Sequence, residues 1–109
     1  MHPFLNIADR AARMAGKTIL DGLKRLDRIR MQEKQDNRGV VTEIDLKAES
    51  IIIDTIREAY PRHGILAEES NPIDGEGYIW IIDPLDGTSN YIHDFPHFAV
   101  SIAIKNKEK

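Results

Sequence analysis

The chain has 109 residues, of which 41% are hydrophobic and 30% are charged, and this balance is typical of one soluble globular domain. A net charge of −3 gives no reason to expect direct binding of nucleic acid, and the lack of cysteine excludes disulfides and thiolate metal sites. Asp9 and Arg10 precede any long apolar run, so the first residues match neither a signal peptide nor a membrane span. We therefore expect a cytoplasmic protein without a membrane partner.

A long helix is predicted over residues 4–29, because apolar residues recur there at steps of three and four. Gly16 and Gly22 each weaken this helix by up to ~1 kcal/mol relative to alanine, so packing must hold it together. Its charged residues are expected to form a solvated face. The expected buried stripe consists of Leu5, Ala8, Ala12, Ala15, Ile19, Leu23 and Leu26.

A polar stretch over residues 31–41 predicts a loop or weak hairpin, and a second helix is expected to begin at Thr42 and to end at Pro61. Thr42 and Asp45 have the spacing of a capping box, with Asp in place of Glu or Gln. On this pattern alone, Asp45 is a first-turn acid that the helix dipole favours. The expected buried stripe consists of Ile44, Ala48, Ile51, Ile52, Thr55, Ile56 and Ala59.

Two predicted strands both end in acids. Residues 65–67 run into Glu68, and residues 78–82 run into Asp83 and Asp86. Residues 80–82 are continuously apolar, which is typical of a strand covered on both faces, and Pro84 is expected to end its regular pairing. If the two strands share an orientation, the three carboxylates converge. Residues 98–104 are expected to form a further strand in the centre of the sheet, so the fold class is α/β with layers of helix and sheet.

Three carboxylates within a few ångströms repel one another, so without a cation at least one would be protonated more readily than usual. Mg²⁺ prefers such oxygen ligands and keeps sites for water and phosphate. Asp83 lies between Glu68 and Asp86 in this arrangement and could bridge two ions, which typically lie ~3.5–4 Å apart in phosphoryl-transfer sites. The pattern therefore predicts a magnesium site where the two strands end.

The residues after Asp86 can open a short helix, whose N-terminal N–H groups suit a phosphate. These would be the backbone groups of Gly87, Thr88 and Ser89. Thr88 could also orient a water molecule whose proton Asp45 accepts. Because no Cys or His is placed as a nucleophile, the expected chemistry is direct attack of water on a phosphate monoester.

Residues 83–91, Asp-Pro-Leu-Asp-Gly-Thr-Ser-Asn-Tyr, resemble the signature of the inositol monophosphatase family. Residues 67–70 resemble its Gly-Glu-Glu-Ser segment, with Ala67 in place of Gly. Residues 41–45 resemble the helix start that carries the activating Asp of that family. The flanking segments look most like its bacterial SuhB-type members. The resemblance spans the whole chain and implies the layered αβαβα sandwich of the sugar-phosphatase superfamily.

The resemblance also implies two or more Mg²⁺ ions in the intact protein. Glu68, Asp83 and the Leu85 carbonyl would bind the first ion, and Asp83 and Asp86 the second. Lys34 matches a loop lysine of the family near the first ion. By this resemblance the catalytic residues are Asp45, Thr88 and Lys34, and the substrate-binding residues are Asp86, Gly87, Thr88 and Ser89.

One departure from the family concerns length. Its enzymes are substantially longer, and an Asp in a Trp-Asp segment of their C-terminal half completes the second metal site. That segment is absent from these residues. We therefore expect residues 1–109 to be the N-terminal part of a domain truncated on its C-terminal side, with a nearly complete first metal site and an incomplete second one.

The function implied is Mg²⁺-dependent hydrolysis of inositol monophosphate or a similar small phosphate monoester by a homodimer. Phosphatases of the same superfamily that act on fructose 1,6-bisphosphate or on 3′-phosphoadenosine compounds stay open, although the compact loop and the flanks argue against them. Two other hypotheses about the function remain open. The protein could be a regulatory partner of transcription antitermination factors and RNA polymerase, or a catalytically incomplete fragment.

Overall fold

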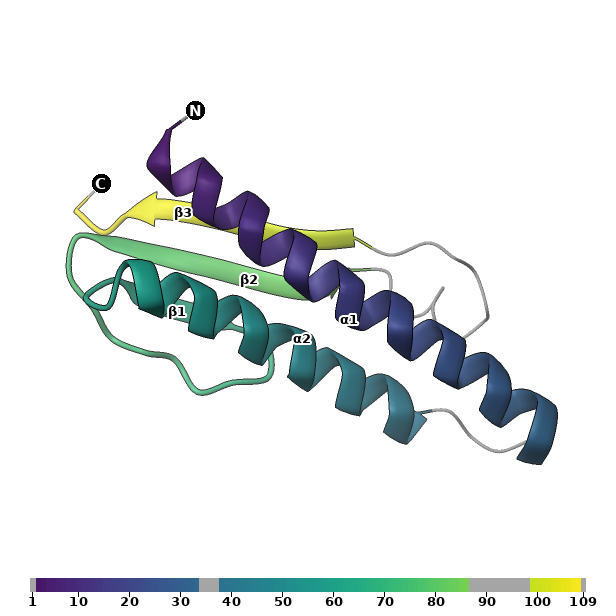
Figure 1. Cartoon of the computed structure of the whole chain (residues 1–109). Helices are drawn as coiled ribbons and strands as arrows, with labels where there is room; N and C mark the ends of the chain where they lie inside the picture. The colour runs from purple at the N-terminus through teal and green to yellow at the C-terminus, as the bar shows by residue number, and fades with distance from the viewer. Residues whose placement is uncertain (1, 34–37, 87–98, 109) are drawn as a thin grey trace.

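The computed structural model describes residues 2–33, 38–86 and 99–108 (Figure 1). Two long helices precede the sheet along the chain. The strands of the described part form one sheet in the order β1-β2-β3. The elements are α1 (Pro3–Glu33), α2 (Arg38–Ala59), β1 (Gly64–Ala67), β2 (Tyr78–Asp86) and β3 (Ala99–Asn106). Within the described ranges, no helix is long and apolar enough to cross a membrane.

β1 and β2 run parallel, with Gly64 opposite Ile79 and Ala67 opposite Ile82. β2 and β3 run antiparallel, so β3 lies at an edge of this sheet and not at the predicted central position. Pro84 was expected to end the regular pairing of β2, but the pairing continues beyond it. The register shifts after Asp83, and pairing resumes between Asp86 and Ala99. The missing N–H of a proline thus coincides with an irregularity of the ladder, not with its end.

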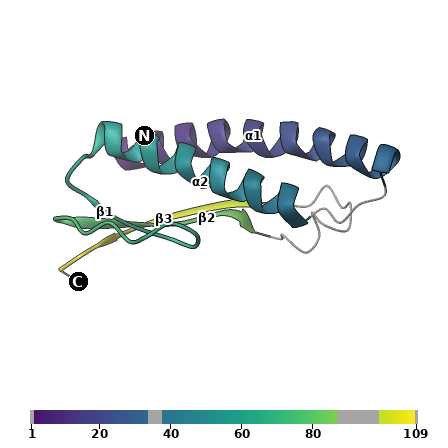
Figure 2. The same ribbon diagram turned by 90° about the horizontal axis from the view of Figure 1, so that it is seen from below.

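Both helices lie on the same face of the sheet, so the described chain has two layers (Figure 2). On the inner face, Trp80 and Ile82 are fully buried. On the outer face, Ile81 is 41% exposed and its neighbour Leu66 is 48% exposed. The prediction of a strand covered on both faces is therefore wrong for the described residues. The core consists of Ala11, Ala15, Ile19, Ile44, Ala48, Ile52, Ile53, Ile56, Ile65, Trp80 and Ile82.

Both helices extend into the stretch that was predicted to be a loop. α1 continues to Glu33, and α2 begins at Arg38 rather than at Thr42. The physical reason is that Met, Gln, Glu and Arg are good helix formers, so a polar run is no barrier to a helix. Thr42 consequently lies inside α2, and its predicted role as a cap is wrong.

The predicted buried stripe of α1 is confirmed at Ala15 and Ile19, but it omitted Ala11 and wrongly included Leu5. Ala11, Ala15 and Ile19 follow one another at steps of four and are fully buried, whereas Leu5 is 57% exposed. The small side chains of Ala11 and Ala15 allow α2 to approach closely, and Ala48 does the same from the other side. For α2 the prediction holds at Ile44, Ala48, Ile52, Thr55 and Ile56 but not at Ala59, which is exposed.

Candidate metal centre

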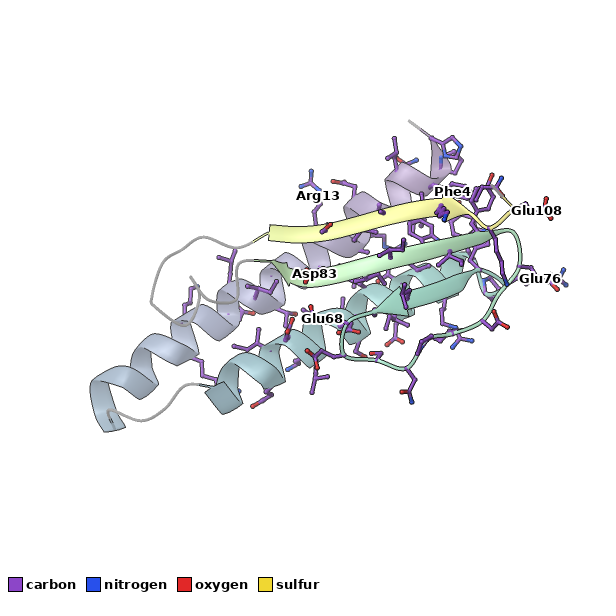
Figure 3. The ribbon with its side chains drawn as sticks, turned by 180° about the vertical axis from the view of Figure 1, so that it is seen from behind. Phe4, Arg13, Glu68, Glu76, Asp83 and Glu108 are labelled. Atoms are coloured by element: carbon purple, nitrogen blue, oxygen red, sulfur yellow. The ribbon has the colours of Figure 1, made fainter. Side chains whose placement is uncertain are left out.

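Glu68 and Asp83 lie side by side because their strands run parallel. Ala67 and Ile82 are partners in the pairing of β1 with β2. Glu68 directly follows Ala67, and Asp83 directly follows Ile82. Their carboxylates lie within hydrogen-bonding reach, and Asp83 is the main cause that raises the pKa of Glu68 above its usual range, followed by slight desolvation of this largely exposed side chain and by Glu69. Figure 3 shows both side chains where β1 and β2 end, at the opposite end of the sheet from Phe4. The parallel pairing thus brings together two of the predicted ligands.

Asp45 reaches the same place from α2. Burial is the main cause that raises its pKa to about 6, and the charges of nearby acids add to the same shift; they are Glu68, Glu69, Glu49 and Asp83. Its Oδ1 atom is buried and has no hydrogen-bond partner within the described part of the chain. Because α2 begins at Arg38, Asp45 lies about two turns inside the helix. Its interpretation as a first-turn acid held by the helix dipole is therefore wrong.

A fourth acid, Glu49, was not predicted to take part. It lies one turn after Asp45 on α2 and is fully buried. Its Oε1 accepts a 2.9 Å hydrogen bond from the backbone N–H of Ser70, and both its oxygens lie 3.2 Å from the backbone N of Glu69. The sequence held one signal for it, since Glu49 follows Ala48 on the apolar side of the helix, at a spacing of four from Asp45.

The other predicted site residues cannot be placed in the same way. Lys34, Gly87, Thr88 and Ser89 lie outside the described residues. Leu85 and Asp86 are described as the last two residues of β2, without their side chains. The predicted residues that the structure does bring together are Asp45, Glu68 and Asp83.

This cluster of acids fits a hard divalent cation by its chemistry. Its donors are carboxylate oxygens, the ligands that Mg²⁺ prefers. No ion pair within the described residues neutralises Asp45, Glu68 or Asp83, and the buried Oδ1 of Asp45 lacks a partner. No three acids or histidines of the described part are arranged to hold one ion by themselves. A bound ion would therefore need at least one further ligand.

Helices layered on a mixed sheet, with acids where parallel strands end, define an α/β protein. The chain belongs to the inositol monophosphatase family, whose sequence profile matches residues 1–109.

Among its relatives, the Nus factor SuhB of Pseudomonas aeruginosa is 54% identical over 98% of this chain and 41% of its own length. Among solved structures, the extragenic suppressor protein suhB from Bartonella henselae has 36% sequence identity to this chain and a TM-score of 0.79. The match covers 97% of this chain and 40% of the Bartonella chain. The structure of the inositol monophosphatase from Anabaena has 38% sequence identity to this chain and a TM-score of 0.76. The match covers 94% of this chain and 35% of the Anabaena chain. The chain thus spans about 40% of the length of the relatives that it matches.

Proposed function

We propose that the protein is a Mg²⁺-dependent hydrolase of small phosphate monoesters, with inositol monophosphate as its substrate. Membership of the inositol monophosphatase family supports phosphatase activity in general. The structural observation that carries the proposal is the cluster of Asp45, Glu68 and Asp83. The charge of Asp83 raises the pKa values of both Asp45 and Glu68, and none of the three acids is paired with a cation among the described residues. Such a cluster is costly unless it serves to bind a cation.

In this proposal Glu68, Asp83 and the Leu85 carbonyl would hold one ion, and Asp83 and Asp86 would hold a second. The bound ions supply positive charge, which favours ionisation of water and offsets the charge that develops on the phosphate. The backbone N–H groups of residues 87–89 bind the phosphate oxygens.

The reaction itself transfers the phosphoryl group to water. The water oxygen forms a bond to phosphorus while the bond from phosphorus to the ester oxygen breaks. Asp45 accepts the proton of the attacking water, and Thr88 orients that water. Lys34 would add a positive charge near the first ion, as its resemblance to the family's loop lysine implies. The leaving oxygen takes a proton from a solvent water, Asp45 releases the proton that it accepted to solvent, and the products are the alcohol and inorganic phosphate. A base with a pKa near 6 is mostly ionised at neutral pH and can take up this proton.

The test measures phosphate release from inositol 1-phosphate with Mg²⁺ and with a chelator. It is run on this chain and on a version extended with the matching remainder of the Pseudomonas aeruginosa relative. We expect Mg²⁺-dependent activity in the extended version, because we propose that residues 1–109 form only part of the catalytic domain. Activity that is equal with and without Mg²⁺ would contradict the two-ion assignment.

Variants of the extended version locate the site. Asp83→Asn and Glu68→Gln should each lower kcat/KM by about 10²-fold or more, since each removes a proposed ion ligand. Glu76→Gln is the matched control, because Glu76 is an exposed acid at the opposite end of the sheet (Figure 3). Equal losses in all three variants would show that net charge matters and the proposed site does not.

A second candidate function is a role in transcription antitermination. The observation that favours it is the name of the 54% identical relative, Nus factor SuhB. In this role the protein would bind antitermination factors through its surface, without turnover of a substrate. A pull-down with such factors separates the two functions, because binding should persist in Asp83→Asn if the partner surface does not use the acids.

A further inference from the structure

The backbone that follows β1 is held by a side chain of α2. Glu49 is fully buried, and its carboxylate accepts hydrogen bonds from two successive backbone N–H groups, those of Glu69 and Ser70. The two elements are far apart in sequence, and the separation between Glu49 and Ser70 is 21 residues. Hydrogen bonds to an ionised acceptor are shorter and stronger than neutral ones, so this contact is a firm link between α2 and the segment after β1.

Glu68 lies between two fixed points because of this link. On one side, Ala67 is paired with Ile82 in the sheet. On the other side, the backbone N–H groups of Glu69 and Ser70 are bound by Glu49. The side chain of Glu68 is itself exposed, so nothing in its own packing fixes it beside Asp83. Its position depends on the backbone that carries it.

The burial of Glu49 is unfavourable in itself. A carboxylate removed from water must recover the lost hydration through hydrogen bonds, and here backbone donors supply them. Burial also places its negative charge close enough to raise the pKa values of Asp45 and Glu68. An apolar residue at position 49 would remove this charge but would leave two backbone N–H groups without an acceptor.

We propose that Glu49 is a positioning residue of the metal centre. It fixes the backbone at Glu69 and Ser70 and thereby holds the Glu68 carboxylate beside Asp83, ready for a cation. Glu49 itself does not contact the ion or the substrate. This inference rests on the proposed function, since it assigns a task to Glu49 in the same site.

The experiment compares the unsubstituted chain with Glu49→Gln and with Ile56→Val. The amide of Gln keeps the shape of the side chain and one acceptor oxygen, but it removes the negative charge and replaces the other oxygen with an NH₂ group, which cannot accept an N–H. Ile56 is fully buried on the same helix, seven residues after Glu49, so Ile56→Val loosens the core about two turns away from Glu49. Binding of Mn²⁺, which shares the oxygen-ligand preference of Mg²⁺, is followed by electron paramagnetic resonance on folded protein. Amide hydrogen exchange of Glu69 and Ser70 is measured on the same samples.

We expect Glu49→Gln to weaken Mn²⁺ binding by about 10–100-fold, the usual effect of removing an outer partner of a ligand. Exchange at Glu69 and Ser70 should become faster in that variant alone. Ile56→Val should lower the melting temperature but leave the Kd for Mn²⁺ unchanged.

The possible failures are distinct. If Mn²⁺ binds equally to all three proteins, Glu49 has only a structural role and the inference is wrong, while the proposed function stands. If Mn²⁺ does not bind the unsubstituted chain at millimolar concentration, the metal site that this chain is proposed to carry is refuted, and the inference falls with it. If Ile56→Val weakens binding as much as Glu49→Gln does, loss of stability explains the effect and the inference is again overturned.

Discussion

Trp80 donates its indole N–H to Nδ1 of His63 across 2.9 Å. The His63 ring also stacks on Tyr60, with ring centres 4.8 Å apart and planes 3° from parallel. Because Nδ1 accepts this hydrogen bond, the imidazole must be neutral and carry its proton on Nε2. Burial lowers the pKa of His63 below its usual value. Protonation of Nδ1 would place two N–H groups face to face and break the contact with Trp80.

The first prediction concerns stability at mildly acidic pH. Since the folded pKa of His63 lies below the unfolded value of about 6.5, the unfolded chain binds the proton more tightly. The stabilisation from neutral His63 is therefore fully present above about pH 6.5 and is lost as the pH falls through the folded pKa. Urea unfolding at pH 7.5 and pH 5.0, followed by the fluorescence of Trp80, the single Trp of the chain, measures the loss.

His63→Phe is the control for this prediction, because Phe keeps a ring beside Tyr60 and does not titrate. The free energy of unfolding should fall less between pH 7.5 and 5.0 in His63→Phe than in the unsubstituted chain. The comparison is made between proteins because Asp45, with its raised pKa, changes stability in the opposite direction in the same range. An identical pH dependence in both proteins would refute the assignment of a neutral His63.

The second prediction concerns Asp45 in the absence of metal. Its folded pKa of about 6 exceeds the unfolded value of about 3.9, so the folded state binds this proton more tightly. The favourable contribution is complete below about pH 4 and is lost as the pH rises through about 6. Above pH 6 the ionised Asp45 thus destabilises the folded state, and Asp45→Asn should stabilise the metal-free chain by about 1 kcal/mol. The effect is smaller than the free energy that corresponds to the whole pKa difference, because solvent screens the charge of a partly exposed side chain.

Chemical denaturation in the presence of a chelator tests the effect of Asp45→Asn. The gain should be present at pH 7.5 and absent at pH 4, where Asp45 is protonated in the folded chain and resembles Asn. In the extended version, the same variant should lose phosphatase activity, because Asn cannot accept the proton of the attacking water. A variant that is less stable than the unsubstituted chain at pH 7.5 would show that the charge of Asp45 is compensated.

The approach of Glu68 to Asp83 was predicted on the condition that their two strands share an orientation. The parallel pairing of β1 and β2 meets that condition. The stripe of α2 at Ile44, Ala48, Ile52 and Ile56 was likewise predictable from its period. In these places the local pattern and the packing agree.

The sequence did not predict the features that depend on several elements at once. The task of Glu49 depends on where the backbone after β1 passes, which no spacing along α2 reveals. The exposure of Ile81 depends on both helices packing on the same face of the sheet, whereas the continuous apolar run suggested cover on both. The predicted boundaries of both helices were wrong for a third reason. Polar residues with good helix propensity do not indicate where a helix begins or ends.

The third prediction uses Gly16 of α1. A Cβ atom added at Gly16 would meet no atom within 4 Å, and its backbone is helical. Gly16→Ala should therefore stabilise the protein by about 0.5–1 kcal/mol, because alanine loses less backbone freedom when the helix forms. The midpoint of urea unfolding should rise without a change of slope. A lower midpoint would mean that the surroundings of α1 tolerate no side chain at this position.

The fourth prediction concerns Gly75, where the loop after β1 passes close to the start of the same strand. A Cβ atom there would collide with the backbone N of Gly64 and would lie 2.6 Å from the carbonyl oxygen of Arg62. That oxygen also accepts a 2.7 Å hydrogen bond from the N–H of Glu76, so the backbone cannot move away without breaking it. Gly75→Ala should lower the free energy of unfolding by about 1–3 kcal/mol, the usual effect of overpacking. Gly16→Ala is the matched substitution, since it adds the same methyl group in open space and should shift the unfolding midpoint in the opposite direction. If both variants shifted the midpoint equally, the close approach of Gly75 to Gly64 would not be present in solution.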